Sequence, residues 1–125
     1  MRVLVCGGRN YTNAVRVHQT MQAVPADATI IVGGARGADS LAEVSALALG
    51  MAVEVYYANW EKYGKSAGVR RNQEMLNSGI DYVIAFDGGR GTEDMVTRAY
   101  SEDVTVYFPD QGTLAPTDFV EKTDG

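Results

Sequence analysis

Short runs of apolar residues alternate along this chain with segments of helical periodicity. The apolar runs are Val3–Cys6, Thr29–Val32, Ala52–Tyr57, Tyr82–Phe86 and Val104–Phe108. They are rich in valine, isoleucine and tyrosine, and several lack polar alternation, which is typical of strands buried on both faces. Apolar residues recur at helical spacing in the segments between them, which are Asn13–Val24, Ala38–Leu49, Arg70–Asn77 and Thr92–Ser101. This order predicts an α/β fold: a single Rossmann-like, doubly wound domain of about five parallel strands with helices on both faces.

The predicted nucleotide-binding domain spans residues 1–108, and residues 109–125 form a C-terminal tail. The tail contains turn residues and little periodicity. We therefore expect it to be loosely attached, although Leu114 and Phe119 could pack on the body.

Composition indicates an ordinary globular protein of 125 residues, which is enough for one hydrophobic core. No apolar stretch approaches the roughly 18 residues needed to cross a membrane, and the start of the chain has no signal-peptide pattern. The single cysteine cannot form an intramolecular disulfide, so we expect a cytoplasmic protein without membrane contact. Cys6 is interpreted as a small buried hydrophobe, with a reactive thiol as the alternative. His18 is interpreted as solvent-facing or helix-packing.

The charge balance is 11 basic against 16 acidic residues, a net charge of −5. This balance argues against non-specific binding to duplex nucleic acid, which needs many uncompensated phosphate contacts. The positive charges are unevenly placed, however. Lys62, Lys65, Arg70 and Arg71 lie close together, with Glu61 as the only acid among them. A local cationic pocket therefore remains open.

Three of the predicted strand-to-helix connections carry a glycine pair with an arginine one or two residues later. They are GGRN (Gly7, Gly8, Arg9, Asn10), GGARG (Gly33, Gly34, Arg36, Gly37) and GGRG (Gly88, Gly89, Arg90, Gly91). In an open parallel sheet these connections share one edge, where ligands bind. Glycine lets backbone N–H groups point at an oxyanion, a helix N-terminus adds orphan donors, and arginine grips phosphate bidentately. The pattern predicts a shared phosphate or pyrophosphate site.

The common nucleotide-binding motifs are absent. After the first strand the sequence is GGRNYT rather than GxGxxG, and no acid closes the second strand to hold a ribose. The motif GxxxxGK[ST] is also missing. One histidine and one cysteine in separate elements make no metal cluster. We therefore predict no metal and no cofactor.

Four motifs in order together resemble one family. MRVLVCGGRNY, GGARGADSLAE, NWEKYGKSAGVRRNQEM and IAFDGGRGTEDMV are similar to the YspA-like branch of the SLOG superfamily. Its members are small Rossmann-like proteins related to the LOG (Lonely Guy) phosphoribohydrolases and to a DNA-processing protein that handles single strands. The resemblance covers roughly residues 1–108. It implies a nucleotide-derived ligand, and we expect a homodimer or higher homo-oligomer.

The resemblance extends to individual residues. GGRGT (Gly88–Thr92) resembles the PGGxGT phosphate loop of the LOG enzymes, with Asp87 in place of proline. Arg71, in RNQEM, resembles the arginine of their RKxxM motif, which serves at the glycosidic bond.

The catalytic glutamate of that family has no direct counterpart here. Met95 occupies its position, and Glu93 and Asp94 fall within the two places before it. Each helical step turns about 100°, so neither acid simply substitutes, although Asp94 could do so with some backbone adjustment. Glu93 and Asp94 also suit the first turn of a helix with Thr92 as its N-cap.

The long connection after the third strand offers candidates for base recognition. Trp60 and Tyr63 are predicted to form an aromatic wall on which a base stacks. For Trp60, the alternative is a structural anchor that packs under the loop. Lys62 and Lys65 either contact phosphates or are ordinary solvated lysines. Arg70 and Arg71 are predicted to open a helix, where the dipole disfavours cations, so we expect at least one to meet a ligand.

Several polar residues have both a capping and a binding interpretation. Asn10 reaches a ribose or phosphate or caps the first helix, and Asp39 caps the second helix or touches a ribose. Asn72, beside Arg71, is also assigned to the ligand site.

These observations support two main hypotheses. In the first, the protein binds, senses or sequesters a nucleotide or nucleotide-derived small molecule such as an ADP-ribose-like ligand. In the second, it hydrolyses the N-glycosidic bond of a nucleoside monophosphate, with Asp94 or Glu93 as the carboxylate and Arg71 as its partner. Single-stranded DNA binding is a third and weaker alternative, because the net charge opposes it.

Overall fold

A five-stranded, all-parallel sheet confirms the predicted Rossmann-like α/β fold. The computed structural model describes residues 1–121. The strands are β1 (Arg2–Cys6), β2 (Thr29–Val32), β3 (Ala52–Val55), β4 (Tyr82–Ala85) and β5 (Thr105–Tyr107). Their order across the sheet is β3-β2-β1-β4-β5, and every neighbouring pair is parallel. The strands β2 and β3 are added on one side of β1, and β4 and β5 on the other. The topological switch point therefore lies between β1 and β4.

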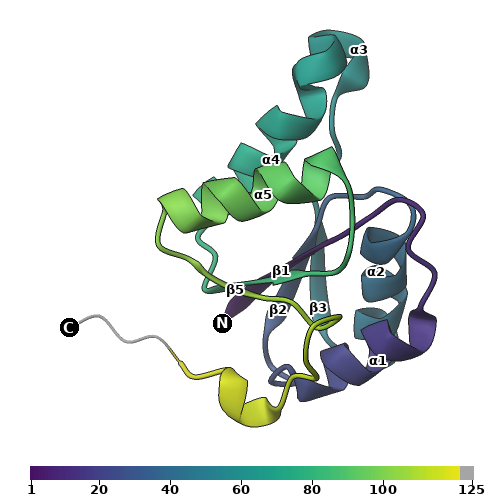
Figure 1. The fold of residues 1–125 in the computed structure, drawn as a ribbon, viewed down its shortest axis with the longest axis vertical. Coiled ribbons are helices and arrows are strands. Elements are labelled where there is room, and N and C mark those ends of the chain that lie inside the picture. Colours follow the sequence, from purple (N-terminus) through teal and green to yellow (C-terminus); the bar gives the residue numbers. More distant parts are fainter. Residues whose placement is uncertain (122–125) are drawn as a thin grey trace.

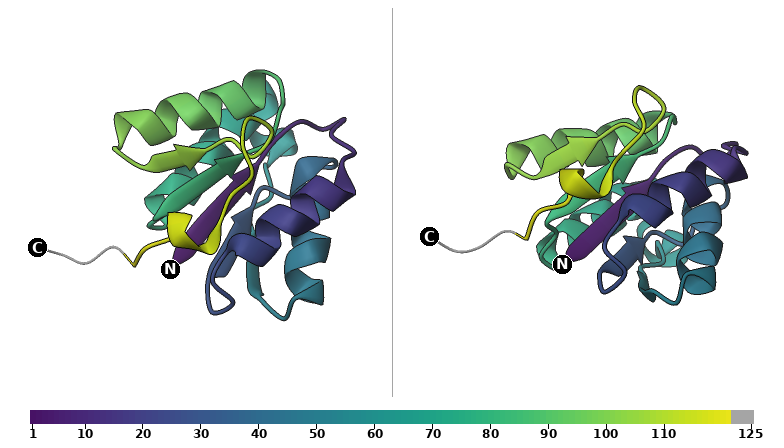
Figure 2. Two further views of the ribbon diagram at one scale, coloured as in Figure 1. Left: turned by 60° about the horizontal axis from the view of Figure 1, so that its bottom comes forward. Right: turned by 90° about the horizontal axis from the view of Figure 1, so that it is seen from below.

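Helices cover both faces of this sheet (Figure 1). They are α1 (Ala14–Ala23), α2 (Ala38–Ala48), α3 (Trp60–Tyr63), α4 (Ala67–Asn77) and α5 (Arg90–Ser101). Figure 2 shows α1 and α2 on one face and α4 and α5 on the other. The short α3 and a 3₁₀ turn, Gly64–Ser66, project beyond the body before α4 returns to it (Figure 1). Within residues 1–121, every helix is too short or too polar to cross a membrane.

The central strands bury side chains on both faces, as the uninterrupted apolar runs predict. In β1, Val3 and Val5 belong to the core beneath α1 and α2, whereas Leu4 and Cys6 belong to the core beneath α4 and α5. Cys6 is buried, as predicted. His18 packs between helices, because its Nδ1 lies 2.7 Å from Ser45 Oγ on α2.

Two predicted helix starts are wrong. The helix α4 begins at Ala67, directly after the 3₁₀ turn, so Arg70 and Arg71 do not open it and the dipole argument for them fails. The helix α5 begins at Arg90 with Gly89 as its N-cap, so Thr92 is not the cap. The third strand also ends earlier than predicted, at Val55.

The described part of the tail, residues 109–121, packs on the body beside the N-terminus (Figure 2). Phe119 is 7% exposed, and its ring lies 5.4 Å from that of Tyr82 and 5.6 Å from that of Tyr107. Tyr107 also donates a hydrogen bond to the backbone oxygen of Asp118 at 2.6 Å. Leu114 packs against the same core. This segment is therefore held by apolar contacts and hydrogen bonds rather than loosely attached.

Candidate functional site

A cleft of about 820 Å³ opens over the carboxyl ends of β1 and β4, at the switch point. We call it the first compartment. The loops after β1 and β4 form one side of it, and the segment from α3 to α4 forms the other. The structure brings fourteen of the predicted site residues to its lining: Gly7, Gly8, Arg9, Asn10, Asp39, Trp60, Lys65, Arg71, Asn72, Gly88, Gly89, Arg90, Gly91 and Thr92.

A second cleft of about 610 Å³ lies over the loop after β2 and adjoins the first. We call it the second compartment. Predicted residues Gly33, Gly34 and Arg36 line it rather than the first. Arg9, Ala35, Trp60 and Arg71 line both compartments. The glycine loops therefore share one edge of the sheet but serve two adjoining spaces.

Two predicted ligand-binding residues line neither compartment. Gly37 has a φ of 79°, and a Cβ there would lie 2.2 Å from the Gly8 oxygen, so this glycine allows two loops to pack closely. The ring of Tyr63 is flanked by the ammonium of Lys62 at 5.0 Å and the guanidinium of Arg70 at 4.4 Å. Tyr63 thus holds cations on the projecting segment.

The predicted catalytic acids also lie outside both compartments. Asp94 accepts a hydrogen bond from Asn72 Nδ2 at 3.0 Å and forms a 2.8 Å ion pair with Arg98. Glu93 lies on a different surface, in a small pocket shared with Phe108. Met95, which occupies the position of the family's glutamate, is fully buried in the core.

Asn72 links the two sides of the first compartment. It is 5% exposed, and its Nδ2 donates to the Gly91 oxygen at 3.2 Å as well as to Asp94. Its Oδ1 accepts from Arg71 Nε at 3.3 Å. Through one side chain, Asn72 therefore holds both the start of α5 and the guanidinium of Arg71.

The loops after β1 and β4 meet directly, but they offer different surfaces to the cleft. The backbone N–H of Gly8 donates to the Asp87 oxygen at 3.0 Å, and the Gly8 oxygen accepts from the Ala38 N–H at 3.1 Å. The backbone groups of Gly8 are therefore already paired within the protein. A Cβ at Gly89 or Gly91 would meet nothing within 4 Å. The start of α5 has no side-chain cap, so its first N–H groups are open to a ligand.

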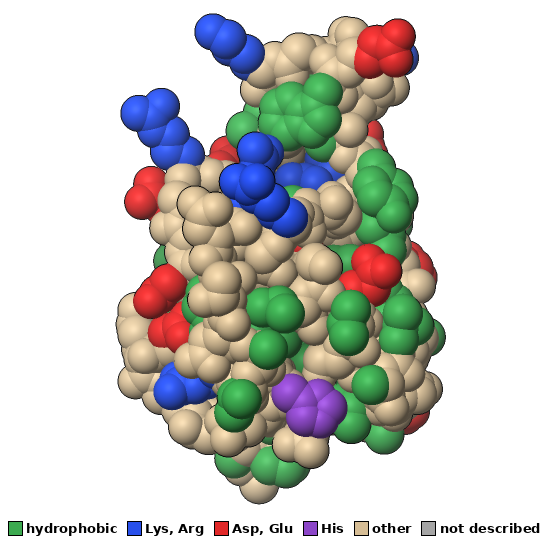
Figure 3. Space-filling view, turned by 90° about the vertical axis from the view of Figure 1, so that its right-hand side faces the viewer, with side chains coloured by type: hydrophobic (Ala, Val, Ile, Leu, Met, Phe, Trp, Pro, Cys, Tyr) green, Lys and Arg blue, Asp and Glu red, His purple; other side chains and the backbone are tan. Residues whose placement is uncertain are grey.

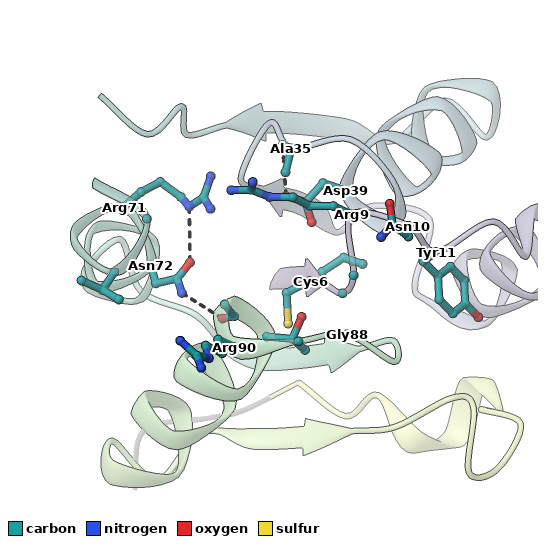
Figure 4. A pocket seen from close by; sticks show the side chains of 18 of the residues that line it. Cys6, Arg9, Asn10, Tyr11, Ala35, Asp39, Arg71, Asn72, Gly88 and Arg90 are labelled. Carbon is teal, nitrogen blue, oxygen red and sulfur yellow. Dashed lines mark hydrogen bonds between the residues drawn. The ribbon is translucent and has the colours of Figure 1, made fainter. Parts of the chain in front are cut away.

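Two guanidinium groups face each other in the cleft (Figure 4). Arg71 lies on Gly33, to whose oxygen it donates a hydrogen bond, and Arg9 points toward it from the loop after β1. Burial lowers the pKa of Arg71; the Asp39 carboxylate opposes this shift and the like charge of Arg9 adds to it. An anion placed between the two arginines would relieve their repulsion.

Asp39 is the carboxyl group buried in this cleft. It is 6% exposed, and its Oδ2 accepts a hydrogen bond from the Ala35 N–H at 3.3 Å. Burial raises the pKa of Asp39 to about 6, although the Ala35 hydrogen bond and the charge of Arg71 oppose the shift. Burial likewise raises the pKa of the neighbouring Cys6 thiol, which argues against a reactive thiolate.

The clefts concentrate positive charge on a chain that is negative overall. Figure 3 shows Lys and Arg side chains gathered where the α3 segment projects over the body. The cations that line the compartments are Arg9, Arg36, Lys65, Arg71 and Arg90. Within residues 1–121, the ion pairs involve other cations, Arg2 with Glu54 and Arg98 with Asp94. Asp39 offsets part of the charge of Arg9 and Arg71, and the other lining cations form no ion pair within the described residues.

Sequence reasoning missed two aromatic residues of the clefts. Tyr57 lines the second compartment. Its place just after β3, at the same sheet edge as the glycine loops, could have identified it from the sequence. Tyr11 lines the first, where its ring packs 5.1 Å from that of Phe86 and its hydroxyl donates to Asp110 at 2.7 Å. Across residues 1–121, no three His, Cys, Asp or Glu side chains gather as a metal site would require.

A parallel five-stranded sheet with glycine loops and a cationic cleft at its switch point defines a Rossmann-like α/β protein. Comparison with known proteins specifies the family. The model of the YspA, cpYpsA-related SLOG family matches residues 1–63, and this chain belongs to that family.

Two relatives illustrate the range of the similarity. The Gene 61 protein of Mycobacterium phage D29 is 34% identical over 116 residues, which cover 84% of this chain and 93% of the relative. The crystal structure of DNA processing protein A (DprA) from Streptococcus pneumoniae shares the fold, with a TM-score of 0.55 and 16% identity. That match covers 94% of this chain but only 59% of DprA.

Proposed function

We propose that this protein binds a nucleotide or nucleotide-derived small molecule, such as an ADP-ribose-like ligand, in the first compartment. Membership of the SLOG family and the fold shared with DprA support a function related to nucleotides or DNA. The observation that carries the proposal is the uncapped start of α5 in a cleft that also contains Lys65, Arg71 and Arg90. A phosphate there meets backbone donors and three cations at once.

The charge of the site favours an anion rather than a neutral ligand. Arg9 and Arg71 face each other, and Arg71 is partly buried, which lowers its pKa. A phosphate between them replaces a like-charge contact with two charge-assisted hydrogen bonds. Asn72 supports this arrangement because it holds Arg71 and Gly91 from behind.

A thermal-shift titration tests the proposal. AMP and ADP-ribose at about 100 times their dissociation constant should each stabilise the protein by roughly 2.7 kcal/mol. Arg90→Ala should weaken this effect, because Arg90 lines the first compartment. Lys62→Ala is the matched control, since it removes the same charge from an exposed position outside both compartments. Equal stabilisation of both variants by AMP would place the site elsewhere.

Hydrolysis of an N-glycosidic bond is the second candidate function. One observation favours it: Asp39, a carboxyl group with a pKa raised to about 6 by burial, lines the first compartment together with Arg71. Groups with such shifts are frequent at catalytic sites. The sequence points instead to Asp94 or Glu93, neither of which lines the cleft.

Chromatography for free base after incubation with AMP separates the two candidates. Release of base that is lost in Asp39→Asn and kept in Asp94→Asn supports hydrolysis through Asp39. The reverse pattern supports the carboxylate that the sequence indicates. A thermal shift without any release of base supports binding alone.

A further inference from the structure

The second compartment has a chemistry of its own. Arg9, Arg36 and Arg71 contribute to its lining, and no carboxylate of the described residues lines it; Asp39 acts on Arg9 and Arg71 from the first compartment. The first compartment, in contrast, contains Asp39 and Asp87. Three guanidinium groups against one neighbouring carboxylate leave the second compartment positively charged and suited to an anion.

Two aromatic rings stand beside these arginines with exposed surface. Tyr57 is 73% exposed, and its ring lies over Gly34, where a Cβ would come within 2.6 Å of it. Trp60 is 49% exposed and lies against Gly68 and Arg9. Rings that rest on glycine and present open surface at a cationic cleft are suited to stack a base.

The charges of the second compartment are not satisfied by a phosphate at α5. Arg36 is exposed, and among the described residues its side chain donates one hydrogen bond, to Asn10 Oδ1 at 3.3 Å. Arg9, Trp60 and Arg71 stand between the two spaces, because they line both. Each space alone, at about 820 and 610 Å³, falls within the usual size of a small-molecule site. A ligand with one phosphate therefore contacts only some of the arginines in the two compartments.

We propose that the ligand carries two phosphate groups separated by a nucleoside, the first at the start of α5 and the second at Arg36 and Arg9, with its base against Tyr57 and Trp60. This inference rests on the proposed function and deepens it, because it names the class of nucleotide. The shared chemistry is that of a free nucleoside bisphosphate or of the end of a nucleic-acid strand.

Calorimetric titration of the full chain with AMP, ADP and adenosine 3′,5′-bisphosphate tests the inference. The bisphosphate should bind about tenfold more tightly than AMP, because it reaches both sets of arginines. Arg36→Ala should reduce the affinity for the bisphosphate about tenfold more than the affinity for AMP or ADP, whose phosphates lie at one end. Tyr57→Ala should instead weaken the binding of all three ligands to a similar degree, because each carries the same base. Lys62→Ala and Tyr100→Ala are the matched controls, because both residues are exposed outside the two compartments.

The outcomes separate this inference from the proposed function. Equal affinity for AMP and the bisphosphate, or an equal effect of Arg36→Ala on both, overturns the inference and leaves nucleotide binding intact. Binding of none of the three probes overturns both. A 5′-phosphorylated dinucleotide distinguishes the two sources: tighter binding than the bisphosphate assigns a strand end, and weaker binding assigns a free nucleotide.

Discussion

Arg9 and Trp60 meet at the boundary between the two compartments, with the guanidinium carbon of Arg9 5.6 Å from the centre of the Trp60 ring. The contact joins the loop after β1 to the projecting helix α3. It is a cation–π contact at a partly exposed site, worth about 0.5–1 kcal/mol. A ligand that enters either compartment meets this pair, because both residues line both spaces.

Replacement of Trp60 distinguishes a stacking surface from a structural anchor. Trp60 is 49% exposed, so Trp60→Ala should change the free energy of unfolding by only about 0.5 kcal/mol. It should weaken nucleotide binding by about 1–3 kcal/mol, and Trp60→Phe should restore part of the loss. Urea denaturation and calorimetry measure the two quantities. A loss of stability of several kcal/mol with unchanged affinity would identify Trp60 as an anchor.

Removal of the Asn72 side chain should destabilise the fold. Asn72→Ala removes the buried amide that donates to Gly91 and Asp94, and loss of these hydrogen bonds should cost about 1–3 kcal/mol in urea denaturation. Asn77→Ala, on the exposed end of the same helix, is the control and should change stability by about 0.5 kcal/mol or less. Equal effects of the two substitutions would contradict the linking role of Asn72.

The stability of the protein should carry a pH dependence from Asp39. Its folded-state pKa of about 6 lies above the ordinary value of 3.8, so the folded state binds more protons between these values. The stability due to this group therefore falls by about 3 kcal/mol at most as pH rises from about 4 to 6. Above that range it stays constant.

The variant Asp39→Asn isolates this contribution, because it keeps an oxygen for the Ala35 N–H and loses the titration. The difference in unfolding free energy between the two proteins should shift in favour of the variant as pH rises through the same window. A difference that is constant from pH 4 to pH 7 would show that Asp39 titrates normally.

The tail should contribute to the stability of the whole domain. Phe119→Ala removes a buried ring from the cluster with Tyr82 and Tyr107, so we expect a loss of about 3 kcal/mol. Val120→Ala provides the comparison, since Val120 is 63% exposed and should tolerate the change. Denaturation curves that are the same for both variants would mean that the tail packs without stabilising the domain.

The fold was predictable because strands that are buried on both faces have apolar residues at every position. Val3–Cys6 is apolar throughout because alternate residues enter two cores. The helix starts were less predictable for a local reason. The N-cap of α4 is Ser66, but its hydroxyl donates to the Tyr63 oxygen instead of capping the helix, and the N-cap of α5 is Gly89. Prediction of helix starts relies on a side-chain cap.

The gathering of the glycine loops at one edge was predictable, but the surroundings of each residue there were not. Parallel strands place their carboxyl ends at one edge, so the glycine loops had to assemble there. Which glycines are open depends on contacts between loops, as Gly37 and Gly91 show by their opposite surroundings. The orientation of Asp94 likewise depends on Arg98 and Asn72, and Asn72 belongs to another helix.

Gly33 lines the second compartment and also makes room for the Arg71 side chain. A Cβ at this position would lie 2.6 Å from Nη1 of Arg71, so any side chain there displaces the guanidinium into the cleft. This glycine of the loop after β2 thus determines the position of a cation contributed by α4. Among related sequences, positions 33 and 71 should accordingly vary as a pair, and a larger residue at 33 should change which anion fits before it changes whether the protein folds.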